Sequence, residues 1–379
     1  MKSKTIYIIL FLFVGFINLT AQKSDGYQFT TEKTISVTSV KDQGRSGTCW
    51  AFATTSFLEA EINRITGKEY NLSEMYFVYH TYLNKAQQYI RFHGNTKFGQ
   101  GGQAHDVFNV IRKYGLVTEK DYSGKKKGTL ICNHRNLEIE LFNLVSKLAF
   151  EEKINPNWIN LADSILQTEL GPLPESCAEK PEDISPLELL AKTNLNLENY
   201  VEITSFMHHP YNSQFILEVP DNWALEKYFN VALNDMIAII DNAIKNGYTA
   251  IWDGDVSEPG FSSIMGIAVI PNVNWSKLNP EMTRYLLSKP NKEMDITPEV
   301  RQLAFDDYET TDDHLMHITG IAHDQKGTKY YITKNSGGSD VGPYGGYIYM
   351  SEAFVKMKTI TITVHKDAIP KDIAGRLGL

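Results

Sequence analysis

The sequence has little cysteine, no excess of basic residues and no internal repeat. Three cysteines in 379 residues are too few for a disulfide scaffold. Acidic residues outnumber basic ones by 45 to 37, and lysine and arginine form no cluster. We therefore expect no nucleic-acid partner, because the positive surface that contacts phosphates is missing. A hydrophobic content of 42% excludes a disordered or collagen-like chain.

The first residues are typical of a targeting segment. Lys2 and Lys4 precede an apolar run from Ile6 to Ile17, and a small residue, Ala21, ends the segment. This order predicts a cleaved signal peptide over residues 1–21. Because the apolar run is short for a bilayer, we expect an exported protein, periplasmic or extracellular, with no stable membrane span after cleavage.

Export would also affect the cysteines. In an oxidising compartment Cys132 and Cys177 are able to pair, which leaves Cys49 as the odd thiol. Two buried, unpaired cysteines would give the same sequence, so both alternatives stay open.

Length and pattern indicate an α+β protein of two lobes with a segment inserted between them. At 379 residues the chain is long for one domain. Helical patterns predominate over residues 22–135, which we expect to form a helical lobe. Residues 136–235 combine helix and loop with several prolines, as in an insertion. Residues 236–379 alternate apolar and polar side chains and are expected to form a β-rich lobe.

Several elements are predicted from local patterns. Apolar residues at helical spacing run from Cys49 to Ile65, and Gly67 ends the helix. A second helix is expected over residues 73–88, with Asn71 or Ser73 as its cap. A third helix is expected to follow the loop at residues 99–102 and to end at Tyr114. A further helix is expected over residues 236–246. Strands are expected over residues 250–255, 320–323, 330–335, 345–350 and 359–364.

Cys49 lies where a glycine-bearing loop becomes a helix. A thiol attacks as the thiolate, and a helix N-terminus favours the thiolate through its dipole and free N–H groups. Attack on a carbonyl creates an oxyanion, which needs preorganised donors. The Cys49 backbone N–H and the side-chain amide of Gln43 are candidates. Most lone cysteines are structural, but this position favours a nucleophile.

A nucleophilic cysteine needs a histidine base that is oriented by a third group. A hairpin from His314 to Asn335 would bring these two side chains together. His317 is the main rival, but positions 314 and 317 face opposite ways on a strand, so only one is able to face the nucleophile. His208 and His209 are more typical of structural residues.

Five separate blocks of sequence carry a resemblance to a known family. The chain resembles papain-like cysteine peptidases in the blocks Gln43-Gly44-x-x-Gly47-x-Cys49-Trp50-Ala51-Phe52, Leu72-Ser73-Glu74, Gly101-Gly102, Asp313-His314 and Asn335-Ser336. It is similar in particular to the bleomycin hydrolase and aminopeptidase C branch in Ser46, Gly101-Gly102-Gln103, Lys113-Tyr114-Gly115 and Trp252-Asp253-Gly254-Asp255-Val256. That branch also carries insertions between the cysteine and the histidine.

The resemblance implies a papain-like two-lobed fold, a helical left lobe and a β-sheet or barrel right lobe, and the roles of four residues. Cys49 is expected to be the nucleophile, His314 the general base and acid, Asn335 its orienter and Gln43 the oxyanion donor. Gly320 matches the family's glycine after the catalytic histidine, which favours His314 over His317. The implied reaction is hydrolysis of peptide bonds through a thioester acyl-enzyme.

The resemblance also implies where a substrate binds. Gly101 and Gly102 are expected to offer backbone hydrogen bonds to an extended peptide, with Asp313 and Leu315 beside it. The expected partners are peptides or proteins. We expect no cofactor, and no metal, because the cysteines and histidines show no metal-ligand spacing.

Two departures from the family keep alternatives open. Gly337 stands where papain-like enzymes usually have a tryptophan that covers the Asn–His hydrogen bond. Residues 365–379 are too few for most of the C-terminal arm by which the branch reads a free amino group, so N-terminally blocked peptides are expected to be cleaved too. Aminopeptidase and endopeptidase activity both stay possible, and the different-class alternative is a weak or inactive homologue that binds peptides.

Overall fold

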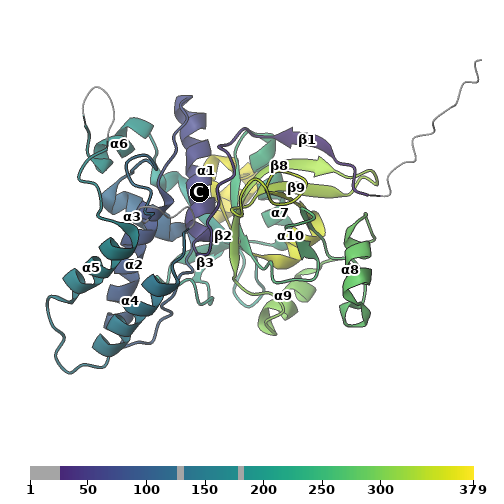
Figure 1. The fold of residues 1–379 in the computed structure, drawn as a ribbon. Helices are drawn as coiled ribbons and strands as arrows, with labels where there is room; N and C mark the ends of the chain where they lie inside the picture. The colour runs from purple at the N-terminus through teal and green to yellow at the C-terminus, as the bar shows by residue number, and fades with distance from the viewer. Residues whose placement is uncertain (1–25, 126–131, 178–182) are drawn as a thin grey trace, which may run out of the picture.

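Two lobes, one helical and one built on a β-sheet, meet along a long helix (Figure 1). The structure is a computed structural model that describes residues 26–125, 132–177 and 183–379. The predicted signal segment, residues 1–21, lies outside the described residues. The α+β fold class, with a helical lobe and a β-rich lobe, is confirmed.

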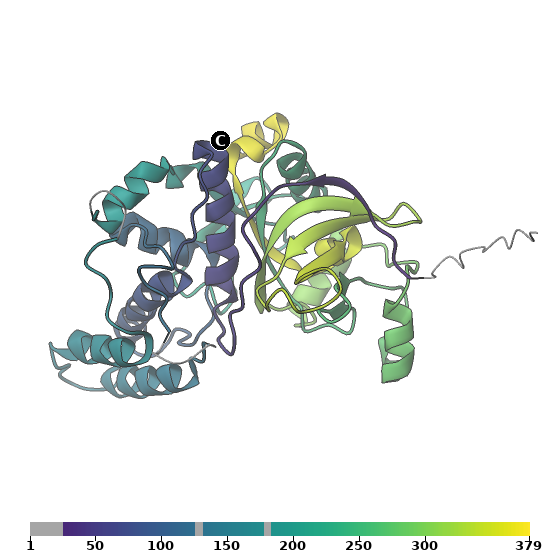
Figure 2. The same ribbon diagram turned by 45° about the horizontal axis from the view of Figure 1, so that its top comes forward.

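The helical lobe contains six helices around one apolar core. They are α1 (Cys49–Thr66), α2 (Glu74–Arg91), α3 (Ala104–Tyr114), α4 (Arg135–Leu148), α5 (Trp158–Leu170) and α6 (Pro186–Thr193). Helix α1 is buried along its whole length from Cys49 to Ile62, because one side packs on the helical lobe and the other on the sheet. Figure 2 shows α1 running between the two lobes.

Local signals set the ends of these helices. Gly67 ends α1 in the left-handed conformation, with φ of 70°, a conformation that glycine adopts without steric cost. Ser73 caps α2 by accepting a hydrogen bond from the Tyr76 backbone N–H at 3.1 Å. Gly115 follows α3 with φ of 82°. The three helices predicted in this region are therefore confirmed.

The second lobe is built on an 11-stranded mixed sheet. Its order is β3-β4-β2-β11-β5-β8-β9-β10-β7-β6, and β1 pairs with β8. The strands are β1 (Thr30–Thr34), β2 (Tyr200–Thr204), β3 (Ser213–Ile216), β4 (Lys227–Asn230), β5 (Ala250–Gly254), β6 (Phe261–Ser262), β7 (Ile267–Ala268), β8 (His314–His323), β9 (Lys329–Lys334), β10 (Tyr347–Ser351) and β11 (Thr359–His365). The strands expected in the last third of the chain are all present.

The register of the central strands determines which residues meet at the lobe boundary. Strands β8 and β9 form the predicted antiparallel hairpin, in which His317 pairs with Lys334. Strand β5 lies on the other side of β8, with Gly254 opposite His314. His314 and Asn335 therefore come from neighbouring strands at the same edge of the sheet.

Five helices accompany the sheet: α7 (Leu233–Lys245), α8 (Pro280–Leu287), α9 (Pro298–Asp306), α10 (Glu352–Lys358) and α11 (Lys371–Leu377). Helix α7 contacts β1, β5 and β8 through its apolar face. Helix α11 is held by the ion pair between Arg376 Nη1 and Asp235 Oδ2, at 2.9 Å, and by the buried Ile373. In the described part of the chain no helix has the length and apolarity to cross a bilayer.

One feature differs from what local patterns indicate, and one alternative that the sequence left open is decided. Strands β2 to β4, within residues 136–235, were expected as helix and loop, yet β2 pairs with β11. These strands have only four or five residues, and β11 lies more than 150 positions further along the chain, so the pairing leaves little local signal. Cys132 and Cys177 form no disulfide; the Cys177 thiol instead donates to the Leu116 carbonyl at 3.5 Å.

Candidate active site

His314 and Asn335 are joined by a hydrogen bond. His314 Nε2 lies 2.8 Å from Asn335 Oδ1, which also accepts from the backbone N–H of Ser336 at 2.8 Å. This second bond fixes the direction of the amide oxygen, so that His314 donates from Nε2 and Nδ1 keeps its lone pair. Burial lowers the pKa of His314, and the hydrogen bond to Asn335 partly offsets this effect. The imidazole is therefore neutral and able to accept a proton at neutral pH.

Cys49 lies at the N-terminus of α1, next to the start of β8. Its thiol is within hydrogen-bond reach of the backbone N–H groups of Trp50 and Leu315, the latter being the residue after His314. Only 7% of Cys49 is exposed. The structure thus brings the predicted nucleophile, base and orienter to one place, from α1, β8 and the end of β9.

The electrostatic environment of Cys49 differs from the expected one. The position at a helix N-terminus predicts a favoured thiolate, but burial raises the pKa of Cys49 to about 12. The backbone N–H groups of Leu315 and Trp50 lower it, whereas the negative charges of Asp312 and Asp221 raise it further. Desolvation outweighs the helix terminus here because the thiol is almost completely buried. In the substrate-free protein the thiol form therefore predominates.

Gln43 is held firmly on the loop before α1. Its Oε1 accepts from Ser336 Oγ at 2.5 Å, and its Nε2 donates to the Ser46 carbonyl at 2.7 Å. A primary amide nitrogen carries two N–H groups, so the second one remains for another acceptor. Ser336 follows Asn335, and the contact therefore ties Gln43 to the end of the strand that carries Asn335.

Side chains of the helical lobe hold the segment Gly99–Gly102 in place through hydrogen bonds to its carbonyl groups. Lys85 is buried and donates to the carbonyls of Gly99 and Gly101, and Trp50 Nε1 donates to the Gln100 carbonyl at 2.9 Å. Gly102 makes no backbone hydrogen bond to another described residue. Of the two predicted substrate-contacting glycines, Gly102 is thus the one with neither backbone group used within the described chain, although it is buried, while the Gly101 carbonyl is already used.

Asp313 and Leu315, the other predicted substrate contacts, make contacts within the protein. Asp313 accepts from the Val256 N–H at 2.9 Å and from Ser257 Oγ at 2.5 Å, which holds the loop after β5. Leu315 is only 3% exposed and belongs to the apolar core of the helical lobe. Both roles in substrate binding remain predictions.

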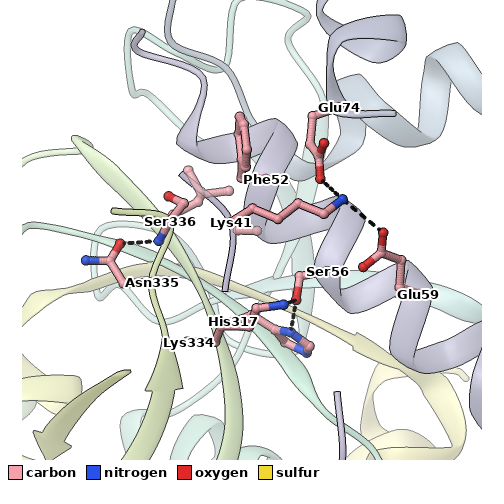
Figure 3. Close-up of a pocket in the computed structure, with 11 residues that line it drawn as sticks. Lys41, Phe52, Ser56, Glu59, Glu74, His317, Lys334, Asn335 and Ser336 are labelled. Atoms are coloured by element: carbon pink, nitrogen blue, oxygen red, sulfur yellow. Dashed lines mark hydrogen bonds and ion pairs between the residues drawn. The ribbon is translucent and has the colours of Figure 1, made fainter. Parts of the chain in front are cut away.

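His317 points away from His314 and into the contact between the lobes. Figure 3 shows Ser56 between His317 and Lys334: Ser56 Oγ lies 2.8 Å from His317 Nδ1 and accepts from Lys334 Nζ at 2.8 Å. Burial lowers the pKa of His317 well below its usual value. In the same view Lys41 Nζ bridges Glu59 and Glu74, at 3.2 and 2.6 Å. These contacts join α1 to β8 and β9 and enclose a cavity with room for about one water.

Sequence reasoning missed a group of acidic side chains near Cys49. Asp312 Oδ2 accepts from Gln103 Nε2 at 2.8 Å. Asp253 on β5 lies opposite Leu315, and its carboxyl is hydrogen-bonded to that of Asp312. Asp221 lies against Gly101, where an added Cβ would meet its carboxylate. We call Asp221, Asp253 and Asp312 the acidic cluster. Asp253 offered a signal, since it is a carboxylate at the end of the apolar run of a buried strand.

One further group of potential metal ligands is present among the described residues. The ligand atoms of His208, His209 and Glu218 lie within 4.8 Å of one another. Hydrogen bonds account for this arrangement, because both Nε2 atoms contact the Glu218 carboxylate, at 3.1 and 2.8 Å. Gln302 Nε2 also contacts His208 Nδ1 at 3.1 Å, which leaves the proton of a neutral His208 on Nε2 rather than a lone pair for a metal.

The position of the missing tryptophan has room for a side chain. A Cβ added at Gly337 would meet only Val341 Cγ2, at 3.9 Å. Tyr344, an aromatic residue further along the same loop, packs its ring 4.7 Å from that of Tyr349. The hydrogen bond between His314 and Asn335 thus has no large ring at position 337 to exclude water.

Gly337→Trp is expected to raise kcat/KM on a peptide amide roughly two- to fivefold, or about 0.5–1 kcal/mol, because a hydrogen bond is stronger when water is excluded. The measurement is the pH profile of kcat/KM beside that of Gly337→Ala, which adds a methyl group but no cover. An equal increase of kcat/KM in both variants, or a decrease of kcat/KM in Gly337→Trp alone, would contradict this explanation.

Two family models together match nearly all of the described chain. One, described as papain family cysteine protease, matches residues 25–168. The other, described as peptidase C1-like family, matches residues 176–377 and so more than half of the chain. The predicted resemblance to papain-like cysteine peptidases of the bleomycin hydrolase and aminopeptidase C branch is confirmed.

Individual relatives agree with the models. Cysteine proteinase 1, mitochondrial, of Saccharomyces cerevisiae (strain JAY291) is 22% identical over 410 residues, which cover 94% of this chain and 80% of that protein. A cysteine proteinase of Theileria parva is 33% identical over 99 residues, 26% of this chain and 20% of that protein. The crystal structure of PepW from Lactobacillus rhamnosis HN001 superposes with a TM-score of 0.72 at 19% identity, over 92% of this chain and 84% of that one, which shows the same fold.

The comparison with the yeast protein corrects the expected location. That relative is a mitochondrial protein by its name, and it matches almost the whole chain. The prediction of an exported, periplasmic or extracellular protein is therefore wrong. It rested on the composition of residues 1–21 alone, and a charged start with a short apolar run is not specific enough to identify a destination.

The fold, the two family models and the yeast relative agree with one another along the chain. They place it among enzymes that hydrolyse peptides with a thiol. The chain therefore belongs to the peptidase C1-like family of papain-type cysteine peptidases.

Proposed function

We propose that the protein hydrolyses peptide bonds through a thioester acyl-enzyme, with Cys49 as nucleophile and His314 as general base and acid. Asn335 orients His314, and the Cys49 backbone N–H and the Gln43 amide stabilise the oxyanion. The observation that carries the proposal is the 2.8 Å bond between His314 Nε2 and Asn335 Oδ1, with the Cys49 thiol beside the backbone of the next residue, Leu315.

Each half of the reaction, acylation and deacylation, moves one proton through the same histidine. His314 Nδ1 takes the proton of the Cys49 thiol, and the thiolate attacks the carbonyl carbon. The C–N bond then breaks as His314 gives that proton to the leaving amine, and the acyl group remains on sulfur. A water molecule, deprotonated by His314, attacks the thioester, releases the acid and restores the thiol.

The substrate is proposed to lie as an extended strand along Gly102. Gly102 is buried, but neither of its backbone groups is used within the described chain, which leaves both for antiparallel pairing with a peptide. Lys85 supports this edge from the protein side, so that the edge does not need to reorganise when a peptide binds.

The experiment is turnover of one chromogenic peptide amide with a free and with an acetylated N-terminus. A burst of amine release equal to the enzyme concentration is expected, because acyl-enzyme forms before it is hydrolysed. Prior treatment with iodoacetamide should abolish the burst. If both peptides fail to react while the protein binds them, the chain is a peptide-binding homologue instead. The lack of a large ring at position 337 beside the His314–Asn335 bond and the raised pKa of Cys49 favour this second candidate.

A comparison of the two peptides also assigns the type of peptidase. Equal cleavage of both would identify an endopeptidase. Cleavage of the free peptide alone would identify an aminopeptidase. Either result supports thiol-dependent hydrolysis.

A further inference from the structure

We propose that the acidic cluster, Asp221, Asp253 and Asp312, binds a cationic group of the peptide substrate next to the scissile bond. This inference rests on the proposed peptidase function and names the class of substrate. The group is an ammonium or guanidinium, either the free α-amino group of the peptide or a lysine or arginine side chain one residue upstream of the cleaved bond.

The cluster lies between the substrate edge and the base. Asp312 is two residues before His314, and Gln103, which donates to it at 2.8 Å, directly follows Gly102. Asp253 is on the neighbouring strand, opposite Leu315. Asp221 lies against Gly101. A peptide paired with Gly102 and presenting its carbonyl to Cys49 would carry its upstream residue past these carboxyl groups.

One buried acceptor atom beside the cluster lacks a donor. Gln103 is completely buried, yet its Oε1 has no hydrogen-bond partner among the described residues. Asp253 is 1% exposed, and the groups beside its carboxyl are the Asp312 carboxyl and the Gln103 amide. Buried acceptors without a donor are rare, because leaving one unsatisfied is costly. An ammonium brings three N–H donors and so supplies the donor that Gln103 Oε1 lacks.

The protein provides little positive charge to balance the cluster. Lys97 Nζ lies 3.1 Å from Asp221 Oδ1, but 47% of its side chain is exposed. Lys85 is buried nearby and donates to the carbonyls of Gly99 and Gly101. Within the described chain, no ion pair involves Asp253 or Asp312.

Both of these carboxyl groups consequently hold protons more tightly than usual. Burial raises the pKa of Asp312 to about 7, and it raises that of Asp253 well above the usual range, to which the charge of Asp312 adds. A hydrogen bond between two carboxyls requires one shared proton. A bound cation can displace that proton and pair with the charge that it leaves.

Asp106, a neighbouring carboxylate, differs from Asp253 and Asp312 in its hydrogen bonds. Asp106 is also buried, and its Oδ1 also lacks a partner among the described residues, but its Oδ2 accepts from the Gln103 backbone N–H and from Trp223 Nε1, both at 2.9 Å. It caps helix α3 and fixes the entry of the chain. The carboxyls of Asp253 and Asp312 receive no backbone N–H bond within the described residues, so local structure does not account for them.

A cation bound to the acidic cluster would also favour ionisation of the Cys49 thiol. The negative charges of Asp312 and Asp221 raise the pKa of Cys49. A cation held between them opposes this effect and favours the thiolate. A substrate with the right charge would thus promote the formation of the nucleophile that attacks it.

The test compares kcat/KM for three versions of one peptide amide: N-terminally free, acetylated, and acetylated with lysine in place of norleucine at the upstream residue. We expect wild type to prefer one of the cationic peptides by at least about tenfold over the neutral one, since a site built around buried charge rejects a neutral analogue. The free and lysine peptides distinguish the two sources of the cation. Asp312→Asn and Asp253→Asn should each reduce that preference toward unity.

The matched control is Asp324→Asn. This carboxylate is also buried, but it accepts from the backbone N–H groups of Lys326 and Thr328 in the turn between β8 and β9, so the preference should be retained. Hydrolysis with equal rates for all three peptides, or a preference that survives in both cluster variants, would overturn this inference and leave the peptidase function intact. Failure of wild type to hydrolyse any peptide would overturn the peptidase function instead.

A second readout does not depend on peptides. Alkylation of Cys49 by iodoacetamide, followed across pH by mass spectrometry at that residue, reports the thiol pKa. Asp312→Asn should move the midpoint of the curve to lower pH, because it removes a negative charge beside the thiol. The same variant would then have a more reactive thiol and a weaker preference for cationic peptides. A merely structural aspartate would not produce this pair of opposite changes, and an unshifted midpoint would contradict the coupling.

Discussion

Cys49→Ala is expected to reduce kcat/KM for peptide amides by at least about a thousandfold, while the fold is retained. Alanine removes the only atom that forms the thioester, and the remaining oxyanion donors and substrate contacts supply only the residual rate. The side chain lost is small, so the free energy of unfolding should change by less than about 1 kcal/mol. Activity is measured on the chromogenic peptide amide, and folding by circular dichroism and Tm.

The matched control for this variant is Cys132→Ala. Cys132 is also a buried thiol, but it lies on the helical lobe, where its carbonyl accepts from the Arg45 backbone N–H. The Cys132→Ala variant should keep its peptidase activity and its burst of amine release. Full activity in Cys49→Ala would exclude the proposed mechanism, whereas equal loss in both variants would show that the effect is one of folding.

His314→Ala should cost nearly as much as the loss of the thiol, at least about a thousandfold in kcat/KM. Burial already disfavours the Cys49 thiolate, so an internal base is needed to remove the proton. His317→Ala should keep most of the activity at 25 °C. It should instead lower the free energy of unfolding by about 1–3 kcal/mol, because Ser56 Oγ loses a buried hydrogen-bond partner.

The two histidine variants therefore separate chemistry from packing. kcat/KM and Tm are measured for both in the same buffer. A variant of His317 that is inactive but as stable as wild type would show that the base had been assigned to the wrong histidine. The same conclusion would follow if His314→Ala kept its activity.

Local signals predicted much of the helical lobe and of the central hairpin. The start of α1 at Cys49, its end at Gly67 and the cap at Ser73 depend on neighbours within a few residues, and all three are present. The separation of His314 and His317 onto opposite faces also follows from the two-residue period of a strand. Strands β1 and β2 were missed because their partners, β8 and β11, are distant in sequence. Strands β3 and β4 pair with each other, but each has only four residues, which is too short for a clear alternating pattern.

The sequence by itself determined the family, the order of the candidate catalytic residues and the elements that carry them, because these depend on residue types at short spacings. Only the tertiary structure decided the electrostatics of the site. The pKa of Cys49 depends on how deeply the thiol is buried between the lobes, and on Asp221 and Asp312, which are far from it in sequence. The burial and the charge of a site depend on all the residues that folding brings together around it, and a local sequence pattern does not show which residues these are.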